Sequence, residues 1–156
     1  MVSKGYKYLW EKNMSVKFKR SSGILLHITA LPNRYGIGSL GSEAYEFVDF
    51  LRNSGQKLWQ VCPLGPTGYG DSPYQVYSSF AGNHLLIDLD NLVKSRLLVK
   101  SDLNNAPEFN SQRVEYERVH EYKDIILRKA YMRFVKQIPK KFESFVKKNA
   151  FWLDEY

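Results

Sequence analysis

One stretch of this sequence, residues 65–75, gathers side chains that can do chemistry. It reads Gly-Pro-Thr-Gly-Tyr-Gly-Asp-Ser-Pro-Tyr-Gln. Glycines and prolines fix an irregular backbone, tyrosines offer flat apolar faces that carry a hydroxyl, and Asp, Ser and Gln supply hydrogen bonds. Sugar rings need this mixture, because their C–H faces stack on aromatic rings while their hydroxyls want directional partners. From composition alone, a compact surface loop packed by its own tyrosines explains the stretch equally well.

A second glycine-rich stretch, residues 36–41, matches the GxGxxG pattern of dinucleotide-binding sites. It reads Gly-Ile-Gly-Ser-Leu-Gly. In a dinucleotide-binding unit the first glycine follows the strand directly, so that the pyrophosphate meets the helix N-terminus. Here residues 30–35, which include Pro32, intervene, and the second strand ends at residues 61–64 without the acid that binds a ribose. The context therefore argues against a dinucleotide site.

The acidic residues of this region offer no clear catalytic pair. Asp88 and Asp90 stand two positions apart at an expected strand end and could act together. Capping of a turn or solvation of the strand end explains them more simply. We expect Asp71, within the glycine-rich loop, to order that loop or to orient a ligand.

Histidine, cysteine and tryptophan occupy positions where packing is the simpler explanation. His27 lies inside an apolar run, as a core histidine with satisfied hydrogen bonds would, and His84 is a still weaker candidate for catalysis. Cys62, flanked by apolar residues, is interpreted as a buried small hydrophobe. Trp59 is interpreted as a core residue.

The apolar pattern predicts one βαβ unit. A near-continuous apolar run at residues 24–29 is typical of a strand in a parallel sheet, and residues 58–64 predict a second strand. Apolar residues at helical spacing predict a helix over about 43–53, with Ser42 as its N-cap and Gly55 as the glycine after its end. This order of elements indicates an α/β protein.

The second half of the chain predicts a long loop followed by helices. Residues 65–83 lack a regular pattern, and loops of this length are usually functional. Within a helical segment over residues 110–156, a helix over about 112–137 is expected to end before Pro139, and another to begin near Phe142. The first of these helices is expected to bury one apolar face and to expose charged residues on the opposite face. The apolar face consists of Val119, Tyr122, Ile126, Ala130 and Phe134.

Composition and charge exclude several functional classes. The chain has 156 residues and a formal charge of +7, but six basic residues and one acid fall within the first twenty, while residues 21–100 have six of each. Because the motif-rich region is neutral, nucleic-acid binding is not expected, and residues 1–18 are interpreted as a basic extension. No apolar run is long enough to cross a membrane or form a signal peptide. A single cysteine and the absence of metal-ligand spacing predict a cytoplasmic protein without a disulfide or metal.

Four segments closely resemble the N-terminal region of the amylomaltases, the 4-α-glucanotransferases of glycoside hydrolase family 77 in the α-amylase clan. They are Ser-Ser-Gly-Ile-Leu-Leu-His-Ile-Thr-Ala-Leu-Pro at 21–32, the glycine motif at 36–41, Gly-Gln-Lys-Leu-Trp-Gln-Val-Cys-Pro-Leu-Gly-Pro-Thr-Gly at 55–68, and Gly-Asp-Ser-Pro-Tyr-Gln at 70–75. The resemblance runs from about Lys19 to the end of the chain and is densest over residues 21–90.

The resemblance implies the N-terminal part of a (β/α)8 TIM barrel with a largely helical insertion after the second strand. Residues 19–156 would then be a fragment of the catalytic barrel, with residues 24–29 and 58–64 as its first two strands. An apolar, aromatic run at residues 151–156 also suggests a truncated chain. In such barrels the loops at the carboxyl ends of the strands build the active site, which is where residues 65–83 fall.

The resemblance also assigns glucan-binding residues. Family members bind glucan through the Ser and Tyr of the Gly-Asp-Ser-Pro-Tyr segment, which implies Ser72 and Tyr74 as substrate-binding residues with Asp71 as their neighbour. Tyr69 resembles a tyrosine that lines a second glucan site. Its partner would be Tyr116, in a Val-Glu-Tyr segment where the family has Val-Asp-Tyr.

A retaining transglycosylase needs two carboxyl groups, one as nucleophile and one as acid/base. In the family these residues and a third, substrate-binding Asp lie on later strands, and none has a matching position here, so no catalytic residue is expected in this chain. The resemblance implies α-1,4-glucans and maltooligosaccharides as substrates, no cofactor, and the remaining C-terminal part of the barrel as the missing partner. A non-catalytic glucan-binding module is the alternative.

These expectations predict that the 156-residue chain alone has no disproportionation activity on maltotriose, because the paired carboxyl groups are absent. The measurement is chromatography of maltotriose incubated with the purified chain. Formation of glucose together with longer maltooligosaccharides would contradict the prediction.

Overall fold

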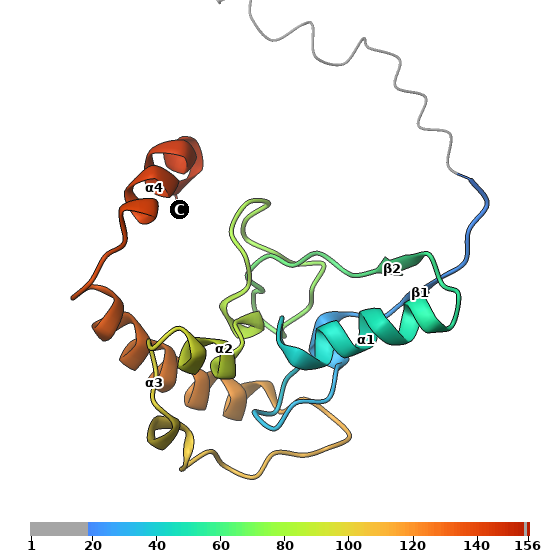
Figure 1. Cartoon of the computed structure of the whole chain (residues 1–156), viewed down its shortest axis with the longest axis horizontal. Helices are drawn as coiled ribbons and strands as arrows, with labels where there is room; N and C mark the ends of the chain where they lie inside the picture. Colours follow the sequence, from blue (N-terminus) through green and yellow to red (C-terminus); the bar gives the residue numbers. More distant parts are fainter. Residues whose placement is uncertain (1–18, 155) are drawn as a thin grey trace, which may run out of the picture.

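The computed structural model describes residues 19–154 and 156, so the predicted basic extension at 1–18 lies outside the described residues. Figure 1 shows the strand pair and α1 at one end of the molecule, α2 beside α3, and α4 joined to the end of α3 by a short linker. The elements in chain order are β1 (Gly23–Leu25), a 3₁₀ turn (Ile28–Ala30), α1 (Ser42–Asn53), β2 (Leu58–Gln60), a 3₁₀ turn (His84–Leu86), α2 (Leu89–Lys94), a 3₁₀ turn (Lys100–Leu103), α3 (Tyr116–Phe134) and α4 (Lys140–Leu153).

The predicted βαβ unit is confirmed, but its strands are shorter than expected. β1 and β2 pair in parallel, with Gly23 opposite Leu58, and α1 forms the crossover. The next acceptor of the ladder, the Leu26 carbonyl, instead accepts a hydrogen bond from Trp59 Nε1 at 2.7 Å. The backbone then turns into the 3₁₀ turn Ile28–Ala30, so the prediction of a strand over 24–29 is wrong in its second half.

Helix α1 is flanked by a glycine on each side. Gly41, not the predicted Ser42, occupies the N-cap position, and its backbone conformation is extended. At the other end Gly55 has φ of +71°, as predicted for the residue after the cap. Its N–H bonds the Arg52 carbonyl at 3.1 Å, and the N–H of Gln56 bonds the Leu51 carbonyl at 2.9 Å. This pair of bonds is the Schellman motif, which satisfies the last carbonyls of the helix.

Helix α3 carries the core of the second half on the predicted face. Val119, Ile126 and Ala130 are buried, whereas Tyr122 and Phe134 of the same face are half-buried. Leu98 and Leu103, between α2 and α3, share one cluster with Ile126 and Ala130. A second cluster lies between the strand pair and α1, and a third joins Ile37 and Leu85 to Val119 of α3. In the described part of the chain, no helix combines the length and apolar content needed to cross a membrane.

Lys123 lies inside this core, although the sequence pattern predicted that the charged residues of α3 face solvent. Its side chain is 1% exposed. The ammonium group donates hydrogen bonds to the Leu85 carbonyl and, at 2.9 Å, to the Ile87 carbonyl. Burial lowers the pKa of Lys123 to about 8, although the carboxylate of Asp88 opposes that shift. Lys123 therefore ties the segment after the long loop to α3 with a cation that folding must desolvate.

The lowered pKa of Lys123 predicts that the free energy of unfolding rises with pH above neutrality. The unfolded chain keeps this lysine protonated to about pH 10.5, whereas the folded state releases the proton near pH 8. Between these values the unfolded chain binds more protons, so the free energy of unfolding should increase by about 2 kcal/mol from pH 7.5 to 9.5. Urea denaturation followed by circular dichroism at several pH values measures this increase.

The matched variants are Lys123→Met, in which the increase should be absent, and Lys147→Met on the exposed surface of α4, in which it should persist. The range stops below pH 10 because burial raises the pKa of Tyr35 to about 12, which acts in the opposite direction at higher pH. An equal slope in the Lys123 variant and the unmodified chain would refute the assignment.

Candidate functional site

The long loop over residues 65–83 follows β2 at the carboxyl end of the strand pair and folds back on itself (Figure 1). Thr67 and Val76 form an antiparallel bridge. The Gly68 N–H bonds the Gln75 carbonyl at 3.1 Å, and the Tyr77 N–H bonds the Pro66 carbonyl at 3.0 Å. These contacts close the base of a short hairpin, so residues 69–74 form its tip.

Asp71 holds the tip of this hairpin, in agreement with its predicted role in ordering the loop. Its φ of +53° is a conformation that Asp tolerates better than most residues, and its N–H bonds the Gly68 carbonyl at 3.0 Å. Carboxylate Oδ1 accepts a hydrogen bond from Thr67 Oγ1 at 3.2 Å and lies 3.1 Å from His120 Nε2. The loop is thereby attached to α3.

The tyrosines of the loop face solvent rather than one another. Tyr69 is 99% exposed, Tyr74 75% and Tyr77 74%. Ser72 Oγ accepts a hydrogen bond from the Tyr74 N–H at 3.4 Å, which joins the two predicted substrate-binding residues. The alternative of a compact loop packed by its own tyrosines is therefore wrong, because their aromatic faces remain open to a ligand.

The hydroxyl of Tyr74 has one side-chain partner. Cys62 Sγ and Tyr74 Oη are hydrogen-bonded at a sulfur–oxygen distance of 3.7 Å, and this hydrogen bond, together with the charge interaction between the two groups, raises the pKa of Tyr74 because it favours the protonated phenol. Cys62 is half-buried rather than buried as predicted. The Tyr74 phenol stays protonated at neutral pH and keeps its own proton to donate to a ligand oxygen.

Tyr116 is the first residue of α3. It packs against the cluster of Ile37, Leu85 and Val119. It also lines a cavity of about 790 Å³ between residues 29–37 and 110–116. His120, which contacts Asp71, is one helical turn further along α3, so the loop and Tyr116 are connected through that turn.

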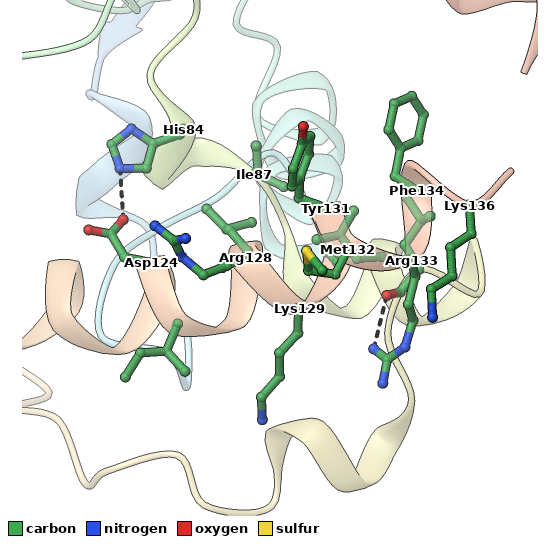
Figure 2. A pocket seen from close by; sticks show the side chains of 15 residues that line it. His84, Ile87, Asp124, Arg128, Lys129, Tyr131, Met132, Arg133, Phe134 and Lys136 are labelled. Atoms are coloured by element: carbon green, nitrogen blue, oxygen red, sulfur yellow. Dashed lines mark hydrogen bonds and ion pairs between the residues drawn. The ribbon is translucent and has the colours of Figure 1, made fainter. Parts of the chain in front are cut away.

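The structure brings together three residues that the sequence pattern did not group. His84 Nε2 lies 3.3 Å from Asp124 Oδ1, as Figure 2 shows, and the rings of His84 and His120 are 5.7 Å apart. One ligand atom from each of the three lies within 4.8 Å of the others. The spacing of His120 and Asp124, four residues apart on one helix, was the only sequence signal for this cluster. His84 is too distant in sequence to be included.

The glycine motif at 36–41 packs the chain rather than binding a nucleotide. A Cβ atom on Gly38 would lie 1.9 Å from the Ile28 carbonyl oxygen, and one on Gly41 would lie 2.1 Å from Asp88 Oδ2. The backbone carbonyl cannot move aside without breaking the turn that contains it. These glycines therefore allow close approach between residues 36–41 and the neighbouring segments.

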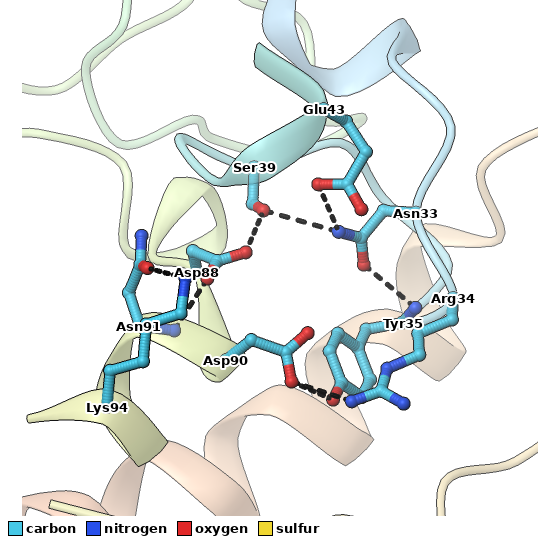
Figure 3. A network of polar contacts seen from close by, with 9 residues as sticks. All are labelled: Asn33, Arg34, Tyr35, Ser39, Glu43, Asp88, Asp90, Asn91 and Lys94. Carbon is cyan, nitrogen blue, oxygen red and sulfur yellow. Dashed lines mark hydrogen bonds and ion pairs between the residues drawn. The ribbon is translucent and has the colours of Figure 1, made fainter. Parts of the chain in front are cut away.

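The two candidate acids beside this motif have structural partners (Figure 3). Asp88 caps α2 by accepting the Asn91 N–H at 2.7 Å and also accepts the Ser39 hydroxyl at 2.8 Å. Asp90 pairs with Arg34 at 2.6 Å and accepts the Tyr35 hydroxyl at 3.1 Å. The simpler interpretation is confirmed for Asp88 in that it is a capping group, but it caps a helix after a 3₁₀ turn, and the expected strand end is wrong. Asp90 instead holds the segment before the glycine motif.

Two candidates remain, Trp59 and His27. Trp59 is a packing residue, whereas His27 has a ring nitrogen without a hydrogen-bond partner among the described residues. Trp59 packs edge-on against Phe47 at 4.9 Å between ring centres, which confirms its place in the core. His27 is half-buried, and burial lowers its pKa. Its Nδ1 has no hydrogen-bond partner among the described residues, so the expectation of a satisfied core histidine is wrong.

The sequence of this chain is similar to a family model and to curated proteins of one family. A family model described as 4-alpha-glucanotransferase matches residues 26–156. A curated 4-alpha-glucanotransferase of Streptococcus pneumoniae is 49% identical over 139 residues, covering 87% of this chain and 27% of that protein. The one of Synechocystis sp. is 45% identical over 142 residues, covering 88% of this chain and 28% of that protein.

A solved structure gives the same match. An amylomaltase from Streptococcus agalactiae in complex with acarbose superposes with a TM-score of 0.80 at 42% identity, covering 86% of this chain and 28% of that one. The chain thus spans little more than a quarter of the length of the relatives that it matches.

The packing role of the glycine motif predicts a loss of stability on Gly38→Ala. The added methyl group must displace the Ile28 carbonyl, and overpacking of this kind costs about 1–3 kcal/mol. The matched control is Gly82→Ala, where a Cβ would meet nothing within 4 Å and which should stay within about 0.5 kcal/mol of the unmodified chain. Urea denaturation of both variants is the measurement, and equal stabilities would count against a packing role.

Proposed function

Because this chain belongs to the 4-alpha-glucanotransferase family, glycoside hydrolase family 77, we propose that it is the N-terminal part of an enzyme that transfers α-1,4-glucan segments between maltooligosaccharides. In a retaining transfer, one carboxylate forms a covalent bond to the anomeric carbon while a carboxylic acid protonates the leaving oxygen. An acceptor hydroxyl, whose proton passes to the conjugate base of that acid, then attacks the anomeric carbon and releases the carboxylate. In this proposal the reacting carboxyl groups lie in the rest of the enzyme, outside this chain.

The proposal includes a (β/α)8 barrel in which β1 and β2 are the first two strands. Their parallel pairing through a helical crossover is the repeating unit of such a barrel. The long loop of residues 65–83, which contains the hairpin, follows β2 at its carboxyl end, where barrel enzymes build their active sites. The following helices, from α2 to α4, form the helical insertion.

A glucan subsite at the hairpin tip is the main contribution of this chain. Tyr74 has an exposed ring on which a glucose unit stacks, and its hydroxyl can donate to a sugar oxygen. Ser72 lies beside it and adds a hydroxyl group, while Asp71 holds the tip in place. The exposure of these tyrosines on a braced hairpin is the observation that carries the proposal.

Tyr69 and Tyr116 form a second glucan site in this proposal. The Tyr69 ring is almost fully exposed, as a stacking platform for a long glucan requires. Tyr116 lies one turn before His120, the residue that contacts Asp71 at the tip of the same hairpin. The partners in this proposal are α-1,4-glucans, maltooligosaccharides and the rest of the barrel. Nucleic acids and membranes are not among the proposed partners, and the proposed location of the enzyme is the cytoplasm.

A chimeric enzyme tests the activity. Residues 26–156 replace the matching segment of the Streptococcus pneumoniae relative, which is 49% identical. The chimera should disproportionate maltotriose, and Tyr74→Ala should lower kcat/KM about tenfold, because the loss of one stacking contact costs on the order of 1.4 kcal/mol. Rates are measured from glucose release.

Tyr45→Ala serves as the matched control, because Tyr45 is as exposed as Tyr74 but lies on α1, away from the hairpin. A folded chimera without transferase activity would refute the proposed function. Equal rates for the Tyr74 and Tyr45 variants would refute the subsite. Glucan binding without transfer would favour a non-catalytic binding module.

A further inference from the structure

Two histidines and an aspartate converge where the long loop meets α3. His84 lies in the 3₁₀ turn that follows the loop, and His120 and Asp124 lie one turn apart on α3. Figure 2 shows the imidazole of His84 and the carboxylate of Asp124 directed toward each other at the rim of a surface cavity of about 1170 Å³. These groups are distinct from the residues of the proposed glucan subsites.

The spacing of the three groups suits a small tetrahedral ion. Two ligands bound at 2.0–2.1 Å to a tetrahedral metal lie about 3.3 Å apart. The distance from His84 Nε2 to Asp124 Oδ1 is 3.3 Å, and a ligand atom of His120 lies within 4.8 Å of the other two. The side chains are 43%, 61% and 36% exposed for His84, Asp124 and His120. They can therefore rotate to close the remaining gap, and an ion can enter from solvent.

Asp71 supplies the outer contact that metal-binding histidines usually have. Its Oδ1 lies 3.1 Å from His120 Nε2, and a carboxylate there favours the tautomer in which Nε2 carries the hydrogen. Nδ1 of His120 then has a lone pair for a metal. This carboxylate–imidazole contact is independent of the contact between His84 and Asp124.

The charged groups around the cluster and the types of its ligand atoms indicate which kind of ion it would bind. Two carboxylates, Asp71 and Asp124, stand against Arg128, whose guanidinium lies on the next turn of α3 and lines the same cavity. Two imidazoles with one carboxylate suit zinc and its neighbours among the transition metals, whereas magnesium and calcium prefer oxygen ligands.

We propose that His84, His120 and Asp124 form a binding site for a divalent transition-metal ion such as Zn²⁺. Asp71 orients His120, and water completes the coordination. The bound ion links the end of the loop, the hairpin tip and α3, so it holds the tyrosines of the tip in one arrangement. The site does not depend on the proposed transferase activity, because none of its ligands contacts a glucan in that proposal.

Isothermal titration of the untagged chain with Zn²⁺ tests the site directly. One equivalent should bind, and Mg²⁺ at the same concentration should not. His84→Gln and Asp124→Asn should each weaken Zn²⁺ binding at least tenfold. Glu121→Gln removes an exposed charge from the same helix without touching the cluster and should leave the affinity unchanged.

The role of Asp71 has its own readout. Asp71→Asn keeps a hydrogen-bond acceptor but removes the charge, so it should weaken Zn²⁺ binding about tenfold. It should also shift the visible absorption of bound Co²⁺, which a change confined to loop packing would not do. Circular dichroism confirms that each variant is folded.

Two results would overturn the proposal. One is the absence of Zn²⁺ binding up to millimolar concentration, and the other is equal affinity in the His84, Asp124 and Glu121 variants. Either result would mean that the cluster is a hydrogen-bonded network without a metal. Because Asp124 is exposed, its variant keeps the test valid even if the His84 variant does not fold.

Discussion

Residues 83–88 form a largely buried segment around the 3₁₀ turn His84–Leu86, and such a segment can be buried only if its backbone polar groups find partners. The Asn83 N–H bonds the Leu64 carbonyl at 2.7 Å, and the Leu86 carbonyl accepts the Leu40 N–H at 2.9 Å. Lys123 donates to the carbonyls on either side of Leu86. Three parts of the chain thus meet on this one segment, and the strand pair, the glycine motif and α3 keep their relative positions through it.

The same anchoring explains why the long loop can present its aromatic rings. The bond between Asn83 and Leu64 brings the two ends of the loop together, and the Asp71–His120 contact holds its tip against α3. A loop fixed at its base and tip loses less conformational entropy when a ligand binds. Exposed tyrosines on such a support are available for stacking without collapsing onto each other.

The glycine motif shows how one sequence pattern can serve a different physical purpose. Gly38 and Gly41 stand where a Cβ would strike a carbonyl or the carboxylate of Asp88. In a nucleotide site the missing side chains allow a phosphate to approach the backbone, whereas here they allow other segments of the same chain to approach it. The absence of an acid after the second strand, visible in the sequence, already favoured that outcome.

The sequence by itself determined the local elements and the family. Periodicity and glycine chemistry predicted the βαβ unit, the end of α1 at Gly55 and the buried face of α3, because these depend on residues close together in the chain. Only the tertiary structure decided where β1 ends, since the Trp59 indole takes the Leu26 carbonyl from across the strand pair. It also decided the burial of Lys123 and the meeting of His84 with His120 and Asp124. These features depend on contacts between residues more than thirty positions apart, which no local pattern encodes.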